Sequence, residues 1–276
     1  MSEWLALAES IARESGALLR ARFDAARTVE FKGAGHSNLV TDADRASEEL
    51  ILSRLARAVP THAVLAEESG AAGQGAYTWF VDPLDGTTNY AHGVPHFCVT
   101  LAVEGPVPGG ETALLAGVVY DPLRDELFSA ARGQGATLNG RRLVASQVCA
   151  LDRALLCTGF PYDLPQHPEA PLGLFLRLVT KAQGMRRMGS AALDLAYVAA
   201  GRFDGFFEFG LKPWDTAAGA LLVTEAGGSM GRLDGEPWSP RFGDVVAAAP
   251  GLTPELPDLC AAFARELGWQ ARAFGA

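Results

Sequence analysis

The spacing of apolar residues in the first half of the chain predicts helices and strands in mixed order. Residues 2–23 and 41–59 repeat apolar side chains at every third or fourth position, which is typical of amphipathic helices. Thr41 or Asp42 would cap the second helix. Five shorter apolar runs predict buried strands: 63–68, 78–82, 97–105, 112–121 and 125–131. Turns with glycine or proline separate the later runs, which favours an antiparallel or mixed sheet, and 133–140 has the composition of a hairpin turn.

The second half, from about residue 145, repeats this alternation in kind. Four segments predict strands: 154–160, 205–210, 228–233 and 244–249. Four segments predict helices: 171–182, 190–201, 214–227 and about 253–267. We therefore expect stacked layers of helix and sheet within one domain over residues 1–276. This domain would have an N-terminal lobe of about 1–145 and a C-terminal lobe of about 146–276.

The charge balance bears on whether the protein is expected to bind nucleic acid. The formal net charge is −9 at pH 7, with 23 Lys and Arg against 32 Asp and Glu. A general nucleic-acid-binding protein needs a basic surface, so nucleic acid is not an expected partner. Either of the pairs Arg141-Arg142 and Arg186-Arg187 could bind an anion locally, and Arg186-Arg187 is the one feature that would favour contact with transcription or RNA machinery.

Cysteine usage and hydropathy indicate the compartment. The four cysteines show no CxxC spacing, and Cys98 and Cys157 lie inside apolar runs, so buried thiols in a reducing compartment are expected. No apolar run reaches the length of a membrane span, and the N-terminus lacks the basic start of a leader peptide. We expect a cytoplasmic protein without a membrane partner.

The stretch WFVDPLDGTTNY, residues 79–90, carries two acids where an apolar strand ends. Pro83 keeps Asp82 extended, and Gly86 allows a sharp turn after Asp85. Two carboxylates facing one point repel each other unless a cation lies between them. Oxygen-only ligands with few histidines nearby favour a hard divalent ion, Mg²⁺ or Ca²⁺, over zinc.

The residues that follow predict an anion-binding turn next to these acids. A glycine followed by the hydroxyl residues Thr87 and Thr88 at the start of a helix presents backbone N–H groups, and phosphate is the usual ligand of such a turn. Acids that bind metal next to an anion-binding turn are typical of metal-assisted phosphoryl transfer.

Other acids gather where strands stop or helices begin, and each also has a structural interpretation. Asp42 and Asp44 would suit the N-terminal end of a helix dipole. Glu67 and its neighbour Glu68 could be a solvated strand end. Asp215 could be the N-cap of the helix predicted over 214–227.

Three stretches, in order along the chain, resemble the motifs of the inositol monophosphatase family: LAEES (65–69), VDPLDGTTN (81–89) and WDTAAGALLVTEAGG (214–228). Residues 188–210 also resemble the bacterial inositol-1-monophosphatase branch. The resemblance spans nearly the whole chain. It implies a layered α+β or α/β fold, the αβαβα five-layer sandwich of the sugar-phosphatase type. It also implies a hydrolase, an inositol-phosphate phosphatase that is lithium-sensitive, is a homodimer and uses two or three Mg²⁺ per active site.

The same resemblance assigns metal ligands. Glu67, Asp82 and the backbone carbonyl of Leu84 would hold one Mg²⁺. Asp82, Asp85 and Asp215 would hold a second, and a third, weaker ion would be held by Glu67 and water. The segment before Thr41 is one residue longer than the family pattern, so a place for Lys32 beside the third ion is left open.

Roles in catalysis and substrate binding follow in the same way. Asp44 and Thr87 would orient the attacking water, and Glu67 would help to deprotonate it. Backbone groups of Gly86, Thr87 and Thr88 would bind the phosphate.

The leaving group, a small phosphorylated polyol or sugar, would be bound by a further set of residues: Asp85, Gly189, Ala191 and Glu208.

Several alternatives stay open at this point. The same chemistry could act on fructose 1,6-bisphosphate, NADP(H), histidinol phosphate or a 3′-phosphonucleotide, because these acids contact only metal and phosphate. A regulatory interaction protein of the transcription or RNA machinery is an alternative of another class, and a structural ion-binding module is a third.

Overall fold

The computed structural model describes residues 3–23, 29–31, 39–271 and 273–274. Lys32 lies outside these residues. Two long helices, α1 (Glu3–Phe23) and α2 (Asp42–Ala58), occupy the N-terminal part of the chain, as the apolar spacing predicts. The short strands β1 (Val29–Phe31) and β2 (Leu39–Thr41) pair with each other as a separate ribbon.

The larger sheet has eight strands in the order β10-β9-β8-β7-β6-β5-β3-β4. Its strands are β3 (Ala63–Ala66), β4 (Gly70–Ala72), β5 (Thr78–Asp85), β6 (Cys98–Pro106), β7 (Thr112–Asp121), β8 (Glu126–Ala131), β9 (Gly135–Leu138) and β10 (Arg141–Arg142). Only β3 and β5 pair in parallel, so the sheet is mixed, as expected. A short helix, α3 (Thr87–Ala91), follows β5 directly.

The smaller sheet has five strands in the order β12-β11-β13-β15-β14. Its strands are β11 (Leu155–Thr158), β12 (Gly184–Arg186), β13 (Gly205–Glu208), β14 (Ser229–Arg232) and β15 (Val245–Ala248). The helices of this half are α4 (Glu169–Val179), α5 (Ala191–Ala199), α6 (Pro213–Glu225) and α7 (Glu255–Leu267), with short 3₁₀ turns at Leu151–Arg153 and Pro250–Leu252.

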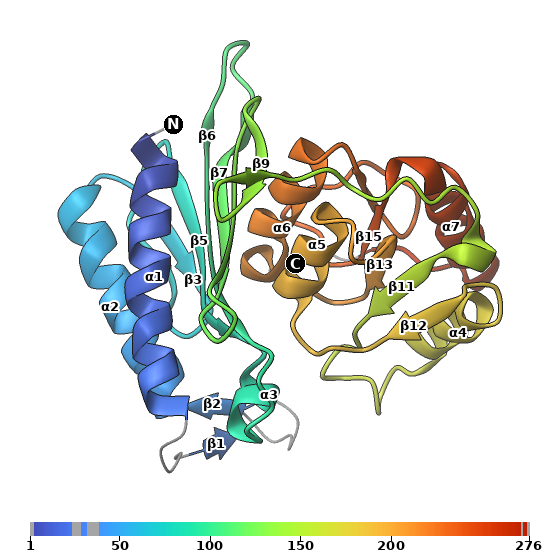
Figure 1. Ribbon diagram of the computed structural model, residues 1–276, viewed down its shortest axis with the longest axis horizontal. Helices are drawn as coiled ribbons and strands as arrows, with labels where there is room; N and C mark the ends of the chain where they lie inside the picture. The colour runs from blue at the N-terminus through green and yellow to red at the C-terminus, as the bar shows by residue number, and fades with distance from the viewer. Residues whose placement is uncertain (1–2, 24–28, 32–38, 272, 275–276) are drawn as a thin grey trace.

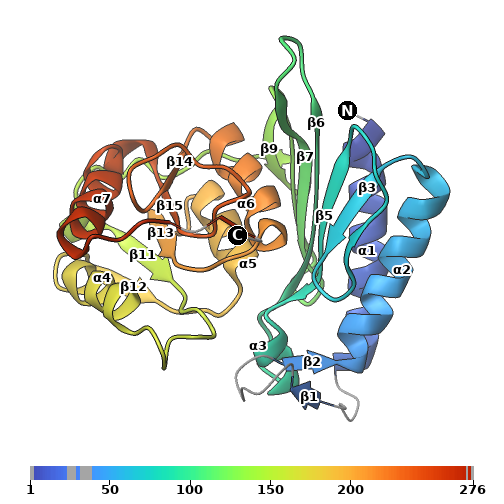
Figure 2. The ribbon, with the colours of Figure 1, turned by 180° about the vertical axis from the view of Figure 1, so that it is seen from behind.

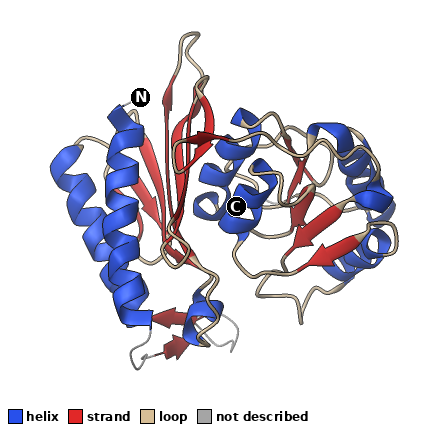
Figure 3. Cartoon of the chain, in the orientation of Figure 1, coloured by secondary structure: helices blue, strands red, loops and turns tan. Residues whose placement is uncertain are grey.

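These elements stack in five layers (Figures 1 and 2). Helices α1 and α2 cover the outer face of the large sheet, and α5 and α6 fill the space between the two sheets. Helices α4 and α7 cover the far face of the small sheet. The order helix, sheet, helix, sheet, helix, also visible in Figure 3, confirms the expected αβαβα sandwich.

The middle layer explains why α5 is buried on all sides. Every residue of α5 is buried, because the helix contacts a sheet on either side and α6 beside it. By contrast, α1 buries one stripe that includes Leu5, Ile11 and Leu19 and exposes the opposite face. In the described part of the chain, no helix is both long and apolar enough to cross a membrane.

Several short elements carry too little pattern to be predicted, among them β4, β12 and the first ribbon. The hairpin turn predicted over 133–140 is confirmed only at its end, because residues 135–138 form strand β9. Asn139 and Gly140, with φ of 49° and 77°, form the bend between β9 and β10. The division into lobes near residue 145 stays a prediction.

Two glycines let the middle layer approach its neighbours. A Cβ on Gly117 of β7 would lie 2.9 Å from Ala218 Cα of α6, and a Cβ on Gly219 would lie 2.5 Å from Leu195 Cβ of α5. The first contact is with backbone, which cannot swing aside, so Gly117 sets the distance between α6 and the large sheet.

Gly117→Ala should therefore lower the free energy of unfolding by about 1–3 kcal/mol, the usual cost of overpacking a core. Urea denaturation would measure the change. Gly231→Ala is the matched control, because its Cβ would meet Val246 Cγ1 at an ordinary 3.6 Å. A stability of Gly117→Ala equal to that of wild type would contradict this account of the packing.

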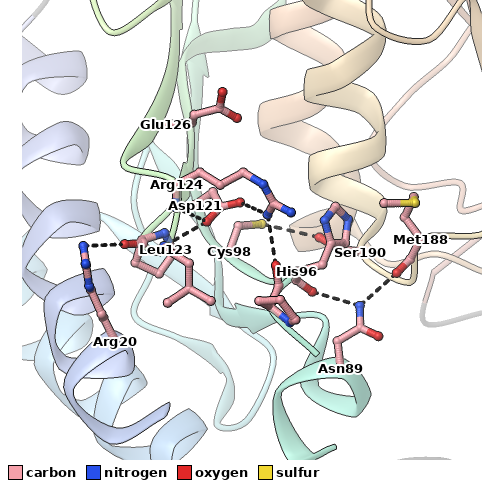
Figure 4. Close-up of polar contacts among 12 residues, drawn as sticks. Arg20, Asn89, His96, Cys98, Asp121, Leu123, Arg124, Glu126, Met188 and Ser190 are labelled. Atoms are coloured by element: carbon pink, nitrogen blue, oxygen red, sulfur yellow. Dashed lines mark hydrogen bonds and ion pairs between the residues drawn. The ribbon is translucent and has the colours of Figure 1, made fainter. Parts of the chain in front are cut away.

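A group of hydrogen bonds joins the end of the large sheet to the segment before α5 (Figure 4). Asn89 Nδ2 donates to the carbonyls of His96 and Met188, at 2.8 Å each. Arg124 donates to Asp121 and to the carbonyl of Pro95. His96 itself is 4% exposed and packs edge-on against the Tyr197 ring, and among the described residues neither of its ring nitrogens has a hydrogen-bond partner.

Burial, reinforced by the positive charge of Arg124, lowers the pKa of His96 to about 4. The unfolded chain, with a pKa of 6.5, binds this proton more readily. The neutral imidazole therefore makes its full contribution to the free energy of unfolding above pH 6.5, and this contribution is lost as the pH falls toward 4. The loss should amount to about 3 kcal/mol by pH 4.

His96→Leu should remove this part of the pH dependence, as measured by denaturation at pH 7 and pH 4. The exposed His92→Asn should behave as wild type. Equal acid sensitivity of wild type and His96→Leu would refute the assignment.

Candidate active site

A register shift in β5 brings its two acids to one side. Between the pairs Asp82–Thr100 and Asp85–Cys98 the strand β5 has one residue more than β6. Residues three apart on a regular strand face opposite sides of the sheet, and such a bulge re-aims the side chains that follow it. Pro83, which has no N–H for the ladder, lies inside the shift. Both acids consequently line the same cavity.

This cavity, of about 260 Å³, lies where the two halves of the fold meet. The large-sheet side contributes Glu67 after β3, the end of β5, and the start of α3. The other side contributes residues after β11, before α5, and between β13 and α6. From this side the cavity is lined by Arg187, Gly189, Ser190, Ala191, Asp194, Glu208 and Asp215.

The acids of the cavity raise one another's pKa. Asp82 is 2% exposed, and burial raises its pKa well above its usual value. The negative charges of Glu67, Asp85 and Asp215 raise it further. Burial, followed by the charges of Asp85 and Glu67, does the same to the pKa of Asp215. Four carboxyl groups therefore share one electrostatic environment.

Asp85 connects the two halves of the molecule. Its Oδ2 accepts hydrogen bonds from Ser190 Oγ at 2.6 Å and from the N–H of Ala192 at 2.8 Å, at the start of α5. Burial raises its pKa to about 6, although these hydrogen bonds favour the ionised form. The link of Cys98 to Ser190, drawn in Figure 4, runs beside this contact.

Asp82 and Asp215, like Asp85, each have one oxygen held by a donor. Asp82 accepts from the N–H of Leu84 at 2.9 Å, and Asp215 accepts from the N–H of Lys212 at 2.7 Å. The N-cap of α6 is thus Lys212, and the interpretation of Asp215 as the cap is wrong by three positions. Within the described ranges, no three Asp, Glu, His or Cys side chains already stand in the arrangement of a metal site.

The donor set nevertheless fits a hard cation. Every candidate ligand is a carboxylate or a carbonyl oxygen, and mutual repulsion disfavours the ionised carboxylates unless positive charge compensates them. Leu84 is fully buried, and its carbonyl oxygen lies 3.0 Å from Thr87 Oγ1.

A hydrogen-bonded pair sits beside these acids. Thr87 Oγ1 donates to Asp44 Oδ1 at 3.1 Å, although 43 residues separate the two in sequence. Thr41 caps α2, and both its N–H and its hydroxyl donate to Asp44 Oδ2. Burial raises the pKa of Asp44 to about 6 against these hydrogen bonds. The N-cap prediction for Thr41 is confirmed, and Asp44 belongs to both the capping box and the site.

Gly86 makes the turn from β5 into α3. Its φ of 93° is accessible to glycine, and a Cβ there would lie 3.0 Å from the carbonyl oxygen of His96. The N–H groups of Thr87 and Thr88 belong to the first turn of α3, which has no partners for them within the helix.

The opposite wall holds the residues expected to contact the leaving group. Gly189, with φ of 86°, and Ala191 lie at the start of α5, and Glu208 ends β13. Burial raises the pKa of Glu208 to about 8, in opposition to the positive charge of Arg187. Gly159 leaves room for Glu208, since a Cβ there would lie 2.2 Å from its carboxylate.

The sequence alone did not indicate that Thr41, besides capping α2, holds Asp44 in place, or that Ser190 donates to Asp85. A serine before an apolar helical run signals an N-cap. No local pattern, however, shows that its hydroxyl reaches an acid 105 residues away.

Comparison with known proteins agrees with this arrangement. The model of the Inositol monophosphatase family matches residues 1–267. Nus factor SuhB of Escherichia coli K12 is 44% identical over 91% of this chain and 92% of its own length. Inositol-1-monophosphatase of Synechocystis is 41% identical over 95% of this chain and 90% of its own.

The fold is also similar to that of a solved structure. The extragenic suppressor protein suhB from Bartonella henselae superposes with a TM-score of 0.86 at 38% identity, covering 94% of this chain and 98% of that one. The chain therefore belongs to the inositol monophosphatase family.

Proposed function

We propose that the protein is a Mg²⁺-dependent phosphomonoester hydrolase that releases inositol and phosphate from inositol 1-phosphate. One observation carries the proposal. A single cavity is lined by the four candidate metal-binding acids Glu67, Asp82, Asp85 and Asp215 and by the turn at Gly86 and Thr87, and the Thr87 hydroxyl donates to the buried Asp44. Membership of a phosphatase family, and a relative named inositol-1-monophosphatase, support the same chemistry.

The metal ligands follow from the cavity. Glu67, Asp82 and the carbonyl of Leu84 would hold one Mg²⁺, and Asp82, Asp85 and Asp215 a second. When bound, Mg²⁺ supplies electrostatic stabilisation of the phosphoryl group and lowers the pKa of coordinated water. A third ion, lithium sensitivity, a homodimer and a cytoplasmic location rest on the family resemblance or the sequence and stay predictions.

The chain's own residues position the reactants. Asp44 is fixed by Thr41, so its other oxygen can hold the Thr87 hydroxyl, which in turn would orient the attacking water. Glu67 would accept the proton from this water. The N–H groups of Gly86, Thr87 and Thr88 would bind the phosphate oxygens, since an anion is favoured at such a turn.

Glu208 and the backbone at Gly189 and Ala191 would bind hydroxyl groups of the leaving polyol. No side chain that could act as a covalent nucleophile is required. Of the buried thiols, Cys98 has a pKa that burial and then Asp85 raise well above its usual value, so it would stay protonated.

Asp85→Asn should lower kcat at least about 1,000-fold, which corresponds to ~4 kcal/mol of the barrier. The amide oxygen can still accept from Ser190 and Ala192, so the thermal unfolding temperature should not fall. Phosphate release and scanning calorimetry measure the two effects. The exposed, remote Asp152→Asn is the control. Retained turnover in Asp85→Asn would argue for a site elsewhere.

The substrate is tested by comparing kcat/KM for D-myo-inositol 1-phosphate with fructose 1,6-bisphosphate, NADP⁺, histidinol phosphate and a 3′-phosphonucleotide. We expect at least about tenfold preference for the inositol ester, a difference of ~1.4 kcal/mol, because Glu208 is placed to bind hydroxyls. A higher kcat/KM for another ester would keep the mechanism and replace the substrate.

The name Nus factor SuhB, carried by several relatives, favours a second candidate. This is a regulatory interaction protein of the transcription or RNA machinery. Arg186 lies exposed on the edge strand β12, where a partner could reach it. Binding of transcription proteins or RNA by the inactive Asp85→Asn variant would support this role. Failure of both wild type and variant to retain any partner would remove it.

A further inference from the structure

A buried carboxyl group in the wall of the cavity has no place in the chemistry described so far. Asp194 lies in the first turn of α5 and is 1% exposed, yet it lines the cavity. Among the described residues, its Oδ1 has no hydrogen-bond partner, and no arginine or lysine forms an ion pair with it. A buried acid without partners costs stability, so its presence calls for a physical reason.

The surroundings make this cost larger. Burial raises the pKa of Asp194 well above its usual value, and the charges of Glu208 and Asp85 raise it further. Among the described residues, the exposed Arg187, which also lines the cavity, is the positive group that acts against them. A favourable position at the N-terminal end of α5 offsets only a small part of this cost.

The position of Asp194 on α5 places it beside the leaving group. Residues three or four apart share one face of a helix, so Asp194 lies one turn below Ser190 and Ala191. All three residues line the cavity together with Glu208. An unsatisfied acceptor therefore stands next to the group that is expected to bind a substrate hydroxyl.

Resting on the function proposed above, we infer that Asp194 is a specificity-determining residue of the leaving-group pocket. Its carboxyl group, which lines the cavity, accepts a hydrogen bond from a second hydroxyl of the polyol, next to the hydroxyl bound by Glu208. The substrate class is then a phosphomonoester of a neutral polyol with at least two free hydroxyls. A second phosphate on this side is disfavoured by Asp85, Asp194 and Glu208.

The reason is the asymmetry of hydrogen bonding in a closed site. A pocket built to bind a hydroxyl discriminates strongly against a ligand without it, because the buried acceptor then stays unpaired. Polyol hydroxyls donate and accept at once, so neighbouring hydroxyls can satisfy both carboxyl groups.

The test compares inositol 1-phosphate with phenyl phosphate, whose leaving group presents no further hydroxyl. Asp194→Ala should raise KM for inositol 1-phosphate roughly tenfold, leave kcat within roughly twofold, and leave phenyl phosphate kinetics unchanged. Asp194→Asn keeps an acceptor oxygen in place and should retain most of the affinity. Equal effects on both substrates, or none on either, would overturn the inference.

Stability separates this role from a structural one. Because Asp194 lacks partners, Asp194→Ala should unfold at the same temperature as wild type or a few degrees higher. The matched control is Asp204, 7% exposed, whose carboxylate accepts from the N–H of Leu155 at 2.6 Å. Asp204→Ala should lower the unfolding temperature and leave KM unchanged. A lower unfolding temperature for Asp194→Ala with unchanged KM would mean a structural role.

A binding measurement keeps failure of the proposed function apart from failure of the inference. Calorimetric titration with free myo-inositol requires no turnover. If wild type hydrolyses neither ester but binds myo-inositol, and Asp194→Ala binds it at least roughly tenfold more weakly, the proposed function fails and the inference stands. Equal binding by both proteins, or binding by neither, overturns the inference even if hydrolysis is observed.

Discussion

Repulsion among carboxylates in one cavity is the constraint on which the rest of the structure depends. Burial and the negative charges of neighbouring acids raise the pKa values of Asp82, Asp85 and Asp215. Each of these acids also has one oxygen held by a backbone or hydroxyl donor. Such a cluster is stable in its ionised form only where a rigid scaffold holds it and positive charge compensates it. The five-layer sandwich supplies the scaffold.

The contact of Asp85 with α5 shows how scaffold and site are joined. The acid ends a strand of the large sheet, and its partners Ser190 and Ala192 begin the central helix. The hydrogen bonds of Asn89 to the carbonyls of His96 and Met188 brace the same junction. The two halves of the fold therefore meet through the residues proposed to bind metal and substrate, so their relative position fixes the site.

Much of this could be predicted from the sequence, because strong periodicity and short motifs are local signals. The long helices, the mixed sheet and the sequence from Asp82 to Thr88 belong to this group. The register shift in β5, the hydrogen bond of Ser190 to Asp85 and the unpaired oxygen of Asp194 could not be predicted. The first depends on the exact pairing of β5 with β6, and the second joins residues 105 positions apart in sequence, so no local pattern encodes either.

The measurement that tests the central claim most directly is calorimetric titration of Mg²⁺ into wild type and Asp82→Asn. Asp82 is proposed as a ligand of both ions and is 2% exposed, so its replacement should weaken both sites. The account predicts at least two Mg²⁺ per wild-type chain and loss of both in the folded variant. Absence of Mg²⁺ binding to wild type, or unchanged binding to Asp82→Asn, would contradict it.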